Sequence, residues 1–262
     1  MQETRQKIFN FINKACNYLP TRKIPRLTRK YTARILGIKD FSLNSGERQT
    51  AKSLDGMRAD HTARYQISIN FLKKHYADKE IYGYDVFCGV GYGSYMLSKE
   101  MHNANIKAID GSTDAIKLAE ENYQTGKIIF SQKFFPFELP EESADFFISL
   151  ESIEHIENDT LFLETIRKTL KINAILIIST PNVYEFKLKT NANHFHYRHY
   201  KPKEFIMRLT TLGFELLHLY GQNTYRMNKK GKITSVLSDS EMTTIKENYE
   251  GQNCVYIFKK IK

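Results

Sequence analysis

The chain has 262 residues, of which 41% are hydrophobic, and a formal net charge of +10. This length fits one sizeable α/β domain with an appendage. No apolar run approaches the ~20 residues of a membrane-spanning helix, and we expect no signal peptide, because an apolar core near the N-terminus is lacking. Three widely spaced cysteines fit neither a disulfide framework nor a zinc site, so we expect a cytoplasmic protein.

The positive charge is concentrated at the N-terminus. Residues 1–39 contain ten basic residues and one acid, Glu3, so this segment holds +9 of the net charge of +10. The nearly neutral remainder makes a nucleic-acid partner an unfavoured interpretation. Apolar residues recur at helical spacing before Pro20: Ile8, Ile12, Ala15 and Leu19. This helix either packs over the domain or contacts an anionic membrane surface peripherally, and both alternatives stay open.

Strand and helix patterns alternate from about Ala59 onward. Seven segments have the pattern of strands: 82–87, 106–109, 128–131, 146–150, 174–179, 214–220 and 255–259. Helical patterns at 92–102, 113–123, 161–170 and 202–212 separate most of them. The alternation predicts a mostly parallel seven-stranded sheet flanked by helices, with ligands at the carboxyl ends of the strands. The polar residues 223–251 are predicted to form a substrate lid or a long loop.

The first strand runs into a glycine-rich turn, Asp85-Val86-Phe87-Cys88-Gly89-Val90-Gly91-Tyr92-Gly93-Ser94. Glycines let the backbone turn tightly and approach a ligand closely. Asp85 stands four residues before Gly89, where a carboxylate suits a cationic amino-acid group better than a pyrophosphate. Asp110 ends the second strand, where its two oxygens can accept hydrogen bonds from a ribose diol.

An E-x-x-E-H motif follows the fourth strand, at Glu151, Glu154 and His155. On a helical turn these residues would share one face beside the ligand. A second loop, residues 193–200, leaves the same edge of the sheet and brings further histidines. Such carboxylates and imidazoles can bind a divalent metal such as Mg²⁺ or Mn²⁺, which would polarise an acceptor hydroxyl. His155 as a metal-free general base, and a solvated helix face, remain alternatives.

The loop from Asp85 to Gly93, together with Asp110, resembles the class I S-adenosylmethionine (SAM)-dependent methyltransferases. The resemblance implies a Rossmann-like fold, SAM as the cofactor, a basic helical extension at 1–58 and a methyltransferase domain at 59–262. It implies a SAM site that comprises Asp85, Gly89, Gly91, Gly93, Asp110 and Leu150. Residues 133–136, after the third strand, lack the acid that often contacts adenine in this family, so the adenine contact stays open.

The E-x-x-E-H motif is similar to that of ubiquinone-pathway O-methyltransferases. It also resembles metal-dependent methyltransferases that modify the 3′-terminal 2′-hydroxyl of small RNAs. In the second group a later histidine completes the metal site. The resemblance therefore implies that Glu154, His155 and His196 are catalytic, with Glu151 as a further metal ligand and His194 as the second choice for the later histidine.

Further motifs resemble bacterial methyltransferases encoded among glycan and O-antigen biosynthesis genes. They are G-E-R at 46–48, H-x-x-R-Y at 61–65, G-Y-G-S at 91–94, E-H at 154–155, S-T-P-N at 179–182 and N-H-F-H at 193–196, and the resemblance covers roughly residues 45–214. It implies that His61, Arg64 and Tyr65 close over the cofactor, with Arg64 pairing with the carboxylate of SAM. A surface position is the alternative for Arg64. His194 replaces the usual proline, and Val90 replaces an acid.

From this set we expect O-methylation of a sugar hydroxyl in surface-glycan biosynthesis, with a glycan or nucleotide-sugar acceptor. An O-methyltransferase of a quinone or catechol, an RNA 2′-O-methyltransferase and a SAM-binding scaffold without catalysis are the alternatives.

Overall fold

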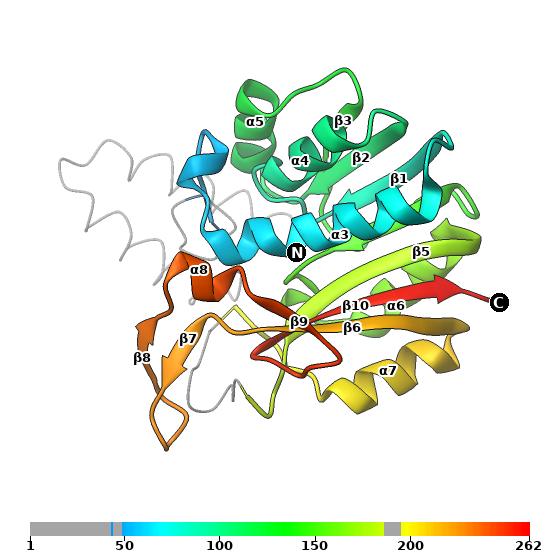
Figure 1. Cartoon of the computed structure of the whole chain (residues 1–262). Coiled ribbons are helices and arrows are strands. Elements are labelled where there is room, and N and C mark those ends of the chain that lie inside the picture. Colours follow the sequence, from blue (N-terminus) through cyan, green and yellow to red (C-terminus); the bar gives the residue numbers. More distant parts are fainter. Residues whose placement is uncertain (1–42, 44–48, 186–194) are drawn as a thin grey trace, which may run out of the picture. The chain divides into compact units, whose positions relative to one another are not determined.

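The structure is a computed structural model that describes residues 43, 49–185 and 195–262. The chain divides into two units, Met1–Arg48 and Gln49–Lys262, and the description below concerns the second (Figure 1). The predicted N-terminal helix lies outside the described residues, as does His194. The division into residues 1–58 and 59–262 therefore stays a prediction.

An eight-stranded sheet forms the centre of this unit, in the order β3-β2-β1-β4-β5-β10-β6-β9. Its strands are β1 Ile81–Val86, β2 Ala104–Asp110, β3 Ile128–Gln132, β4 Ala144–Ser149, β5 Leu170–Pro181, β6 Phe214–Gln222, β9 Ile245–Glu247 and β10 Asn253–Lys260. Strands β1 to β5 pair in parallel, whereas β10 is antiparallel to both β5 and β6. The predicted Rossmann-like fold with a mostly parallel sheet is confirmed, and β9 adds an eighth strand at one edge.

The sheet register aligns the ends of the central strands. Asp85 of β1 lies opposite Ala108 of β2 and Ile148 of β4. Strand β6 runs parallel to β5, because both are antiparallel to β10. The turns that follow β1, β2, β4, β5 and β6 therefore leave from one edge of the sheet, the carboxyl edge.

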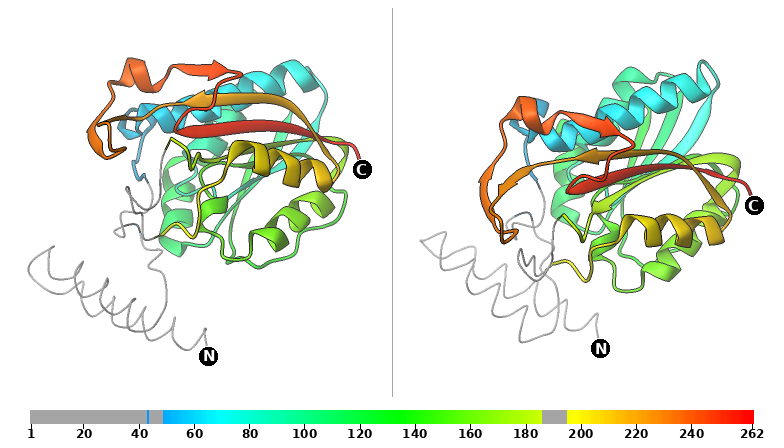
Figure 2. Two further views of the ribbon diagram at one scale, coloured as in Figure 1. Left: turned by 90° about the horizontal axis from the view of Figure 1, so that it is seen from below. Right: turned by 60° about the horizontal axis from the view of Figure 1, so that its bottom comes forward.

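Helices cover both faces of the sheet. They are α3 Ala59–Tyr76, α4 Tyr92–Glu100, α5 Thr113–Asn122, α6 Asp159–Thr169 and α7 Pro202–Thr211, with short 3₁₀ turns η1 Leu54–Gly56 and η2 Ile153–His155. Figure 2 shows α3 on one face and α6 and α7 on the opposite face. Local sequence sets the helix ends: the Ser112 hydroxyl accepts a hydrogen bond from the Ala115 amide, and Gly213 (φ 90°) follows α7.

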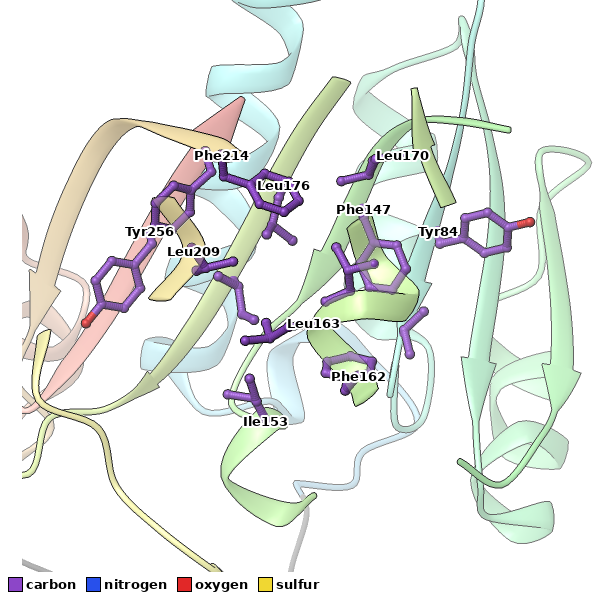
Figure 3. Packing of buried hydrophobic residues seen from close by; sticks show 14 of the residues in the cluster. Tyr84, Phe147, Ile153, Phe162, Leu163, Leu170, Leu176, Leu209, Phe214 and Tyr256 are labelled. Carbon is purple, nitrogen blue, oxygen red and sulfur yellow. The ribbon is translucent and has the colours of Figure 1, made fainter. Parts of the chain in front are cut away.

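The hydrophobic core lies between the sheet and helices α6 and α7. Strand β4 and residues 174–181 of β5 are buried throughout, as expected for strands covered on both faces. Figure 3 shows Phe147 and Leu176 of the sheet beside Phe162 and Leu163 of α6. This packing fixes the start of α6, and with it the turn between β4 and α6 that carries the E-x-x-E-H motif.

The segment 223–251 was predicted to be a substrate lid or a long loop; the loop is wrong, because the segment contains regular elements, and the lid stays a prediction. It forms a two-stranded hairpin of β7 Tyr225–Met227 and β8 Ile233–Val236, then helix α8 Asp239–Met242 and edge strand β9. These elements have three or four residues each. Such runs are too short to carry a recognisable hydrophobic period. Among the described residues, no helix is both long and apolar enough to cross a bilayer.

Candidate functional site

Asp110 fastens the glycine-rich turn to the end of β2. Its Oδ2 accepts a hydrogen bond from the Gly89 amide at 3.0 Å, and its Oδ1 accepts one from the Ser112 amide at 2.8 Å. Gly89 has φ 58°, and a Cβ placed on it would meet no atom of the described residues within 4 Å. The backbone of this turn therefore borders open space at the carboxyl edge, as a turn that a ligand approaches closely requires.

Asp85 lies beneath the same turn and is buried. Tyr65 donates its hydroxyl to the two carboxylate oxygens of Asp85, at 3.0 and 3.1 Å, and the Ser94 hydroxyl donates to Oδ2 at 2.6 Å. Burial raises the pKa of Asp85 to about 6, and the charge of Asp110 adds to this, although the two hydroxyl donors act in the opposite direction. The carboxyl groups of Asp85 and Asp110 thus lie at the ends of two neighbouring strands, both in contact with the glycine-rich turn or the helix that follows it.

Gly91 and Gly93 are needed for packing. A Cβ on Gly91, at φ 85°, would lie 2.7 Å from the ring of Phe130, and a Cβ on Gly93 would lie 2.0 Å from the ring of Tyr65. The Tyr65 ring therefore lies directly on the start of α4. This contact joins the H-x-x-R-Y motif of α3 to the glycine-rich turn, which the sequence resemblance had placed near the same cofactor.

Arg64 is 1% exposed, so the alternative of a surface position is wrong. Its Nη1 donates to Oε1 of Gln222 at 2.5 Å and lies 3.4 Å from Oδ2 of Asp60. His61 lies beside this pair, with Nε2 3.9 Å from the Asp60 carboxylate. Burial and the charges of Arg64 and Arg58 lower the pKa of His61 to about 3, against the opposite effect of Asp60, so His61 is neutral at pH 7. Pairing of Arg64 with SAM stays a prediction.

The structure brings Glu154, His155 and His196 together at the carboxyl edge. One potential ligand atom from each residue lies within 4.8 Å of the other two. The rings of His155 and His196 meet edge to face, with centroids 4.5 Å apart. Glu154 Oε1 is 3.9 Å from His155 Nε2. The composition of this trio suits a divalent cation or a proton transfer.

Glu154 is 1% exposed. Burial and the nearby charge of Glu151 raise its pKa well above the ordinary value, and its Oε2 makes no hydrogen bond to any described residue. A buried carboxyl oxygen without a partner is costly unless a ligand, water or cation completes its contacts. The trio thus has the character of a binding site rather than of a closed structural cluster.

The predicted common helical face is wrong for Glu151. Only Ile153–His155 form a helical turn, and Glu151 precedes it with φ 50°. Its carboxylate accepts a hydrogen bond from the Ser179 hydroxyl at 2.8 Å, and it lies outside the trio. Leu150 directly precedes Glu151 and is half-buried. The Leu150 carbonyl accepts a hydrogen bond from the Ser152 hydroxyl. The assignments of Glu151 to a metal and of Leu150 to the cofactor stay predictions.

Sequence reasoning missed the residues that position His196. The His196 Nδ1 and His199 Nε2 atoms are 2.7 Å apart. The Tyr197 amide donates to the Glu154 carbonyl at 2.8 Å. Asp159 of α6 accepts hydrogen bonds from the side chains of Tyr200 and Arg208. It also forms an ion pair with Arg198, whose Nη1 lies 2.7 Å from Oδ2 of Asp159. These contacts hold residues 195–200 against the turn after β4, and only the histidine-rich composition of the loop hinted at them.

Comparison with known proteins identifies the family to which this chain belongs. The methyltransferase domain family matches residues 78–246. The chain is 26% identical over 129 residues to the Mycobacterium tuberculosis protein named "Probable S-adenosylmethionine-dependent methyltransferase Rv3030", a match that covers 48% of this chain and 46% of that protein. A similarly named protein of Mycolicibacterium smegmatis is 25% identical over 131 residues, which cover 49% of this chain and 50% of that one. The chain thus spans about half the length of these curated relatives.

Solved structures agree on the fold. A crystal structure of an S-adenosylmethionine-dependent methyltransferase from Mesorhizobium loti superimposes with a TM-score of 0.57 at 13% identity, covering 77% of this chain and 100% of that one. The YcgJ protein of Bacillus subtilis gives a TM-score of 0.54 at 13% identity, covering 75% and 99%. Identities this low support the fold alone.

The residues present fit SAM. The Gly89 turn borders open space, and carboxylates lie at the ends of both β1 and β2, where the cationic amino group and the ribose hydroxyls of SAM need acceptors. The family match covers well over half of the chain and includes both carboxylates. This chain therefore belongs to the methyltransferase domain family, and it has the Rossmann-like fold of the class I SAM-dependent methyltransferases.

Proposed function

We propose that the enzyme transfers the methyl group of SAM to a sugar hydroxyl of a surface-glycan precursor, such as a nucleotide-linked or lipid-linked glycan. The observation that carries the proposal is the trio of Glu154, His155 and His196, in which Glu154 is buried and both histidines are half-buried. The trio lies at the same edge of the sheet as the glycine-rich turn after β1, here called the cofactor turn. A hydroxyl is a weak nucleophile, whereas the sulfonium of SAM is already a strong electrophile. A site for hydroxyl acceptors therefore needs groups that accept the hydroxyl proton or weaken the O–H bond, and this trio supplies such groups.

In the transfer step the acceptor oxygen forms a bond to the methyl carbon while the sulfur–carbon bond breaks. The sulfur retains the bonding electron pair, S-adenosylhomocysteine leaves, and the hydroxyl proton passes to an imidazole nitrogen of His155 or His196. Burial and the nearby charge of Glu151 raise the pKa of Glu154 and favour its protonated form, so we assign the proton transfer to the imidazoles. The carboxyl group of Glu154, 3.9 Å from His155 Nε2, would hold that imidazole in place.

The same trio fits a divalent cation, Mg²⁺ or Mn²⁺, held by Glu154, His155 and His196. A bound cation would lower the pKa of the acceptor hydroxyl. Burial disfavours the charged form of Glu154 when no cation is near, and a cation would reverse that preference. Metal-assisted and metal-free transfer therefore need the same three side chains and differ only in their response to chelators.

The sugar as acceptor rests on the motif set at residues 46–48, 61–65, 91–94 and 179–182, which resembles glycan-cluster methyltransferases. The basic segment 1–39 suits work at an anionic membrane surface. It lies outside the described residues, so peripheral membrane contact is part of the proposal.

The test uses the full-length protein with SAM and three acceptor classes: nucleotide-linked sugars, simple glycosides and a catechol. Product is measured as S-adenosylhomocysteine release and as the mass of a methylated acceptor. We expect methylated sugar, with kcat reduced at least about 100-fold in Glu154→Gln, His155→Ala and His196→Ala. Glu157→Gln and His102→Ala, which alter exposed residues, are the matched controls. Turnover of the catechol without any sugar would overturn the acceptor assignment in favour of the quinone-pathway alternative.

The same assay separates the two mechanisms. It is repeated after treatment with EDTA and after addition of Mg²⁺ or Mn²⁺. Activity that EDTA abolishes and Mg²⁺ or Mn²⁺ restores would assign the trio to a cation. Activity unchanged by EDTA would assign it to proton transfer alone.

A further inference from the structure

The β7–β8 hairpin carries a concentration of positive charge in a nearly neutral body. Residues 223–238 include four basic residues and no acidic residue; the basic residues are Arg226, Lys229, Lys230 and Lys232. Arg226 pairs with Glu241 at 2.6 Å. The three lysines are exposed and form no ion pair with any residue that the structure describes. The hairpin turn therefore presents three ammonium groups that no acidic side chain of the described residues pairs with.

The turn between β7 and β8 holds these lysines close together. The Asn228 side-chain oxygen accepts hydrogen bonds from the amides of Lys230 and Lys232, at 3.0 and 3.1 Å. The Asn228 amide donates to the Lys232 carbonyl, and Gly231 adopts φ 74°. Three charges within four positions of a hydrogen-bonded turn create a local positive potential, which attracts a multivalent anion such as a phosphate more strongly than a monovalent one.

The hairpin belongs to the carboxyl edge that bears the methyl-transfer site. It follows β6, which ends at the same edge as β5, and Figures 1 and 2 show it projecting beyond that end of the sheet. Its base is fixed by Gln252, whose Oε1 accepts from the Thr224 and Tyr225 amides at 3.0 and 2.9 Å. The orientation of the hairpin is thus set by the folded body.

Buried polar contacts continue from the hairpin base to the cofactor turn. Thr224 donates its hydroxyl to Asp60, and Arg58 contacts both Asp60 and the Tyr225 hydroxyl. Asp60 and Arg64 belong to α3, and the next residue, Tyr65, donates to Asp85. The lysine turn and the cofactor turn are therefore attached to the same helix, at its N-terminal end.

We propose that Lys229, Lys230 and Lys232 bind a phosphate or diphosphate group of the acceptor. This inference rests on the proposed function and narrows its substrate class to phosphate-bearing glycans, such as nucleotide-linked or lipid-linked sugars. Lysine ammonium groups bind phosphate as point charges, without a requirement for one fixed geometry. An anionic acceptor would be concentrated at the mouth of the site while its sugar hydroxyl reaches the trio.

The test measures binding of inorganic pyrophosphate by calorimetry, with saturating S-adenosylhomocysteine present to fill the cofactor site. The full-length protein is compared with the triple variant Lys229→Gln, Lys230→Gln, Lys232→Gln. The matched control is Lys74→Gln, Lys127→Gln, Lys262→Gln, which removes the same charge from lysines that form no ion pair with described residues and lie away from the hairpin. We expect pyrophosphate affinity to fall at least about tenfold in the hairpin variant and to be unchanged in the control. Equal affinity in the two triple variants would overturn the proposal.

A second arm distinguishes the source of the phosphate. Sedimentation with phosphatidylglycerol–phosphatidylcholine vesicles is compared between the two triple variants. If the hairpin variant loses pyrophosphate binding while both variants bind vesicles equally, the lysines bind a phosphate of the acceptor. Loss of vesicle binding with intact pyrophosphate binding would assign the lysines to the lipid surface and overturn the proposal. Neither readout requires methyl transfer, so failure of the sugar assignment would leave this result standing.

Discussion

Gly93 shows how one residue ties the cofactor turn to a distant helix. Replacement by alanine would put a methyl group 2.0 Å from the Tyr65 ring. We expect Gly93→Ala to destabilise the fold by about 1–3 kcal/mol and to weaken SAM binding, because the displaced ring carries the hydroxyl that contacts Asp85. Thermal unfolding and calorimetric titration with SAM measure both effects. Gly126→Ala, where a Cβ meets no atom within 4 Å, is the control.

His199 is expected to position His196. The His196 Nδ1 and His199 Nε2 atoms are 2.7 Å apart, so this contact fixes the orientation of the His196 ring within the trio. We expect His199→Ala to lower kcat about 10- to 100-fold with SAM affinity unchanged. His199→Asn, which keeps a hydrogen-bonding group, should restore part of the loss. Unchanged kcat in the alanine variant would contradict the positioning role.

Individual residues were predictable where a local pattern carries the chemistry. Asp85 and Asp110 stand at strand ends beside glycines, and the structure places both at the cofactor turn. The partners of Arg64 were not predictable: Gln222 lies 158 residues away, on a strand whose register depends on the whole sheet. His199 offered only the signal of a third histidine in a short loop.

At the scale of elements, long periodic segments were predicted well and short ones poorly. The seven predicted strands all exist, since each has at least five residues and is long enough to show its pattern. The E-x-x-E-H motif was expected on a regular helical turn, but Glu151 leaves β4 in a left-handed conformation and bonds to Ser179 of β5. A cross-strand hydrogen bond of this kind overrides local helix propensity, and no local signal reveals it.

The buried carboxylate of Asp159 connects α6 to α7 and to the loop that contains His196. Loss of this carboxylate should weaken the contact between α6 and the loop. We expect Asp159→Asn to destabilise the protein by about 3 kcal/mol, because Arg208 and Arg198 lose a buried partner. Burial alone would raise the pKa of Asp159, but hydrogen bonds from Arg208 and Tyr200 outweigh it and lower the pKa to about 2. Its stabilising effect is therefore complete above pH 4 and lost as the pH falls toward 2.

Denaturant unfolding at pH 7 and at pH 3 tests both predictions, because it gives the free energy of unfolding of wild type and variant at each pH. The difference between wild type and Asp159→Asn should shrink at the lower pH. Glu204→Gln removes the exposed pair with Lys201 and should change the free energy of unfolding by less than about 1 kcal/mol. A difference that stays constant with pH would show that the charge of Asp159 is not what holds the loop.

Over the whole molecule, the sheet brings together sites that are far apart in sequence. The cofactor turn follows β1, the trio is built from the segments after β4 and β5, and the lysine hairpin follows β6. All of them leave the same carboxyl edge, which is where open α/β sheets bind ligands. The fold therefore accounts for the convergence, while the acceptor is decided by the side chains on these turns.

The burial of Asp85 beneath the cofactor turn makes the stability of the cofactor-free protein depend on pH. Burial raises the pKa of Asp85 from an ordinary value of 3.8 to about 6. The folded protein then holds this proton more tightly than the unfolded chain. The contribution of Asp85 is complete below pH 4 and is lost as the pH rises through 6. From pH 5 to 7.5 this amounts to about 1 kcal/mol, or ~2–4 °C in Tm.

Asp85→Asn isolates this effect, because every other group titrates equally in the two proteins. We expect the Tm of wild type to fall by ~2–4 °C relative to Asp85→Asn between pH 5 and 7.5. SAM brings a cationic amino group that favours the ionised carboxylate, so its affinity for wild type should rise about tenfold from pH 5 to pH 7 and stay flat in the variant. Parallel pH profiles of the two proteins would mean that Asp85 does not contact the amino group of SAM, and the acid of the glycine-rich turn would then serve only to hold Tyr65 and Ser94.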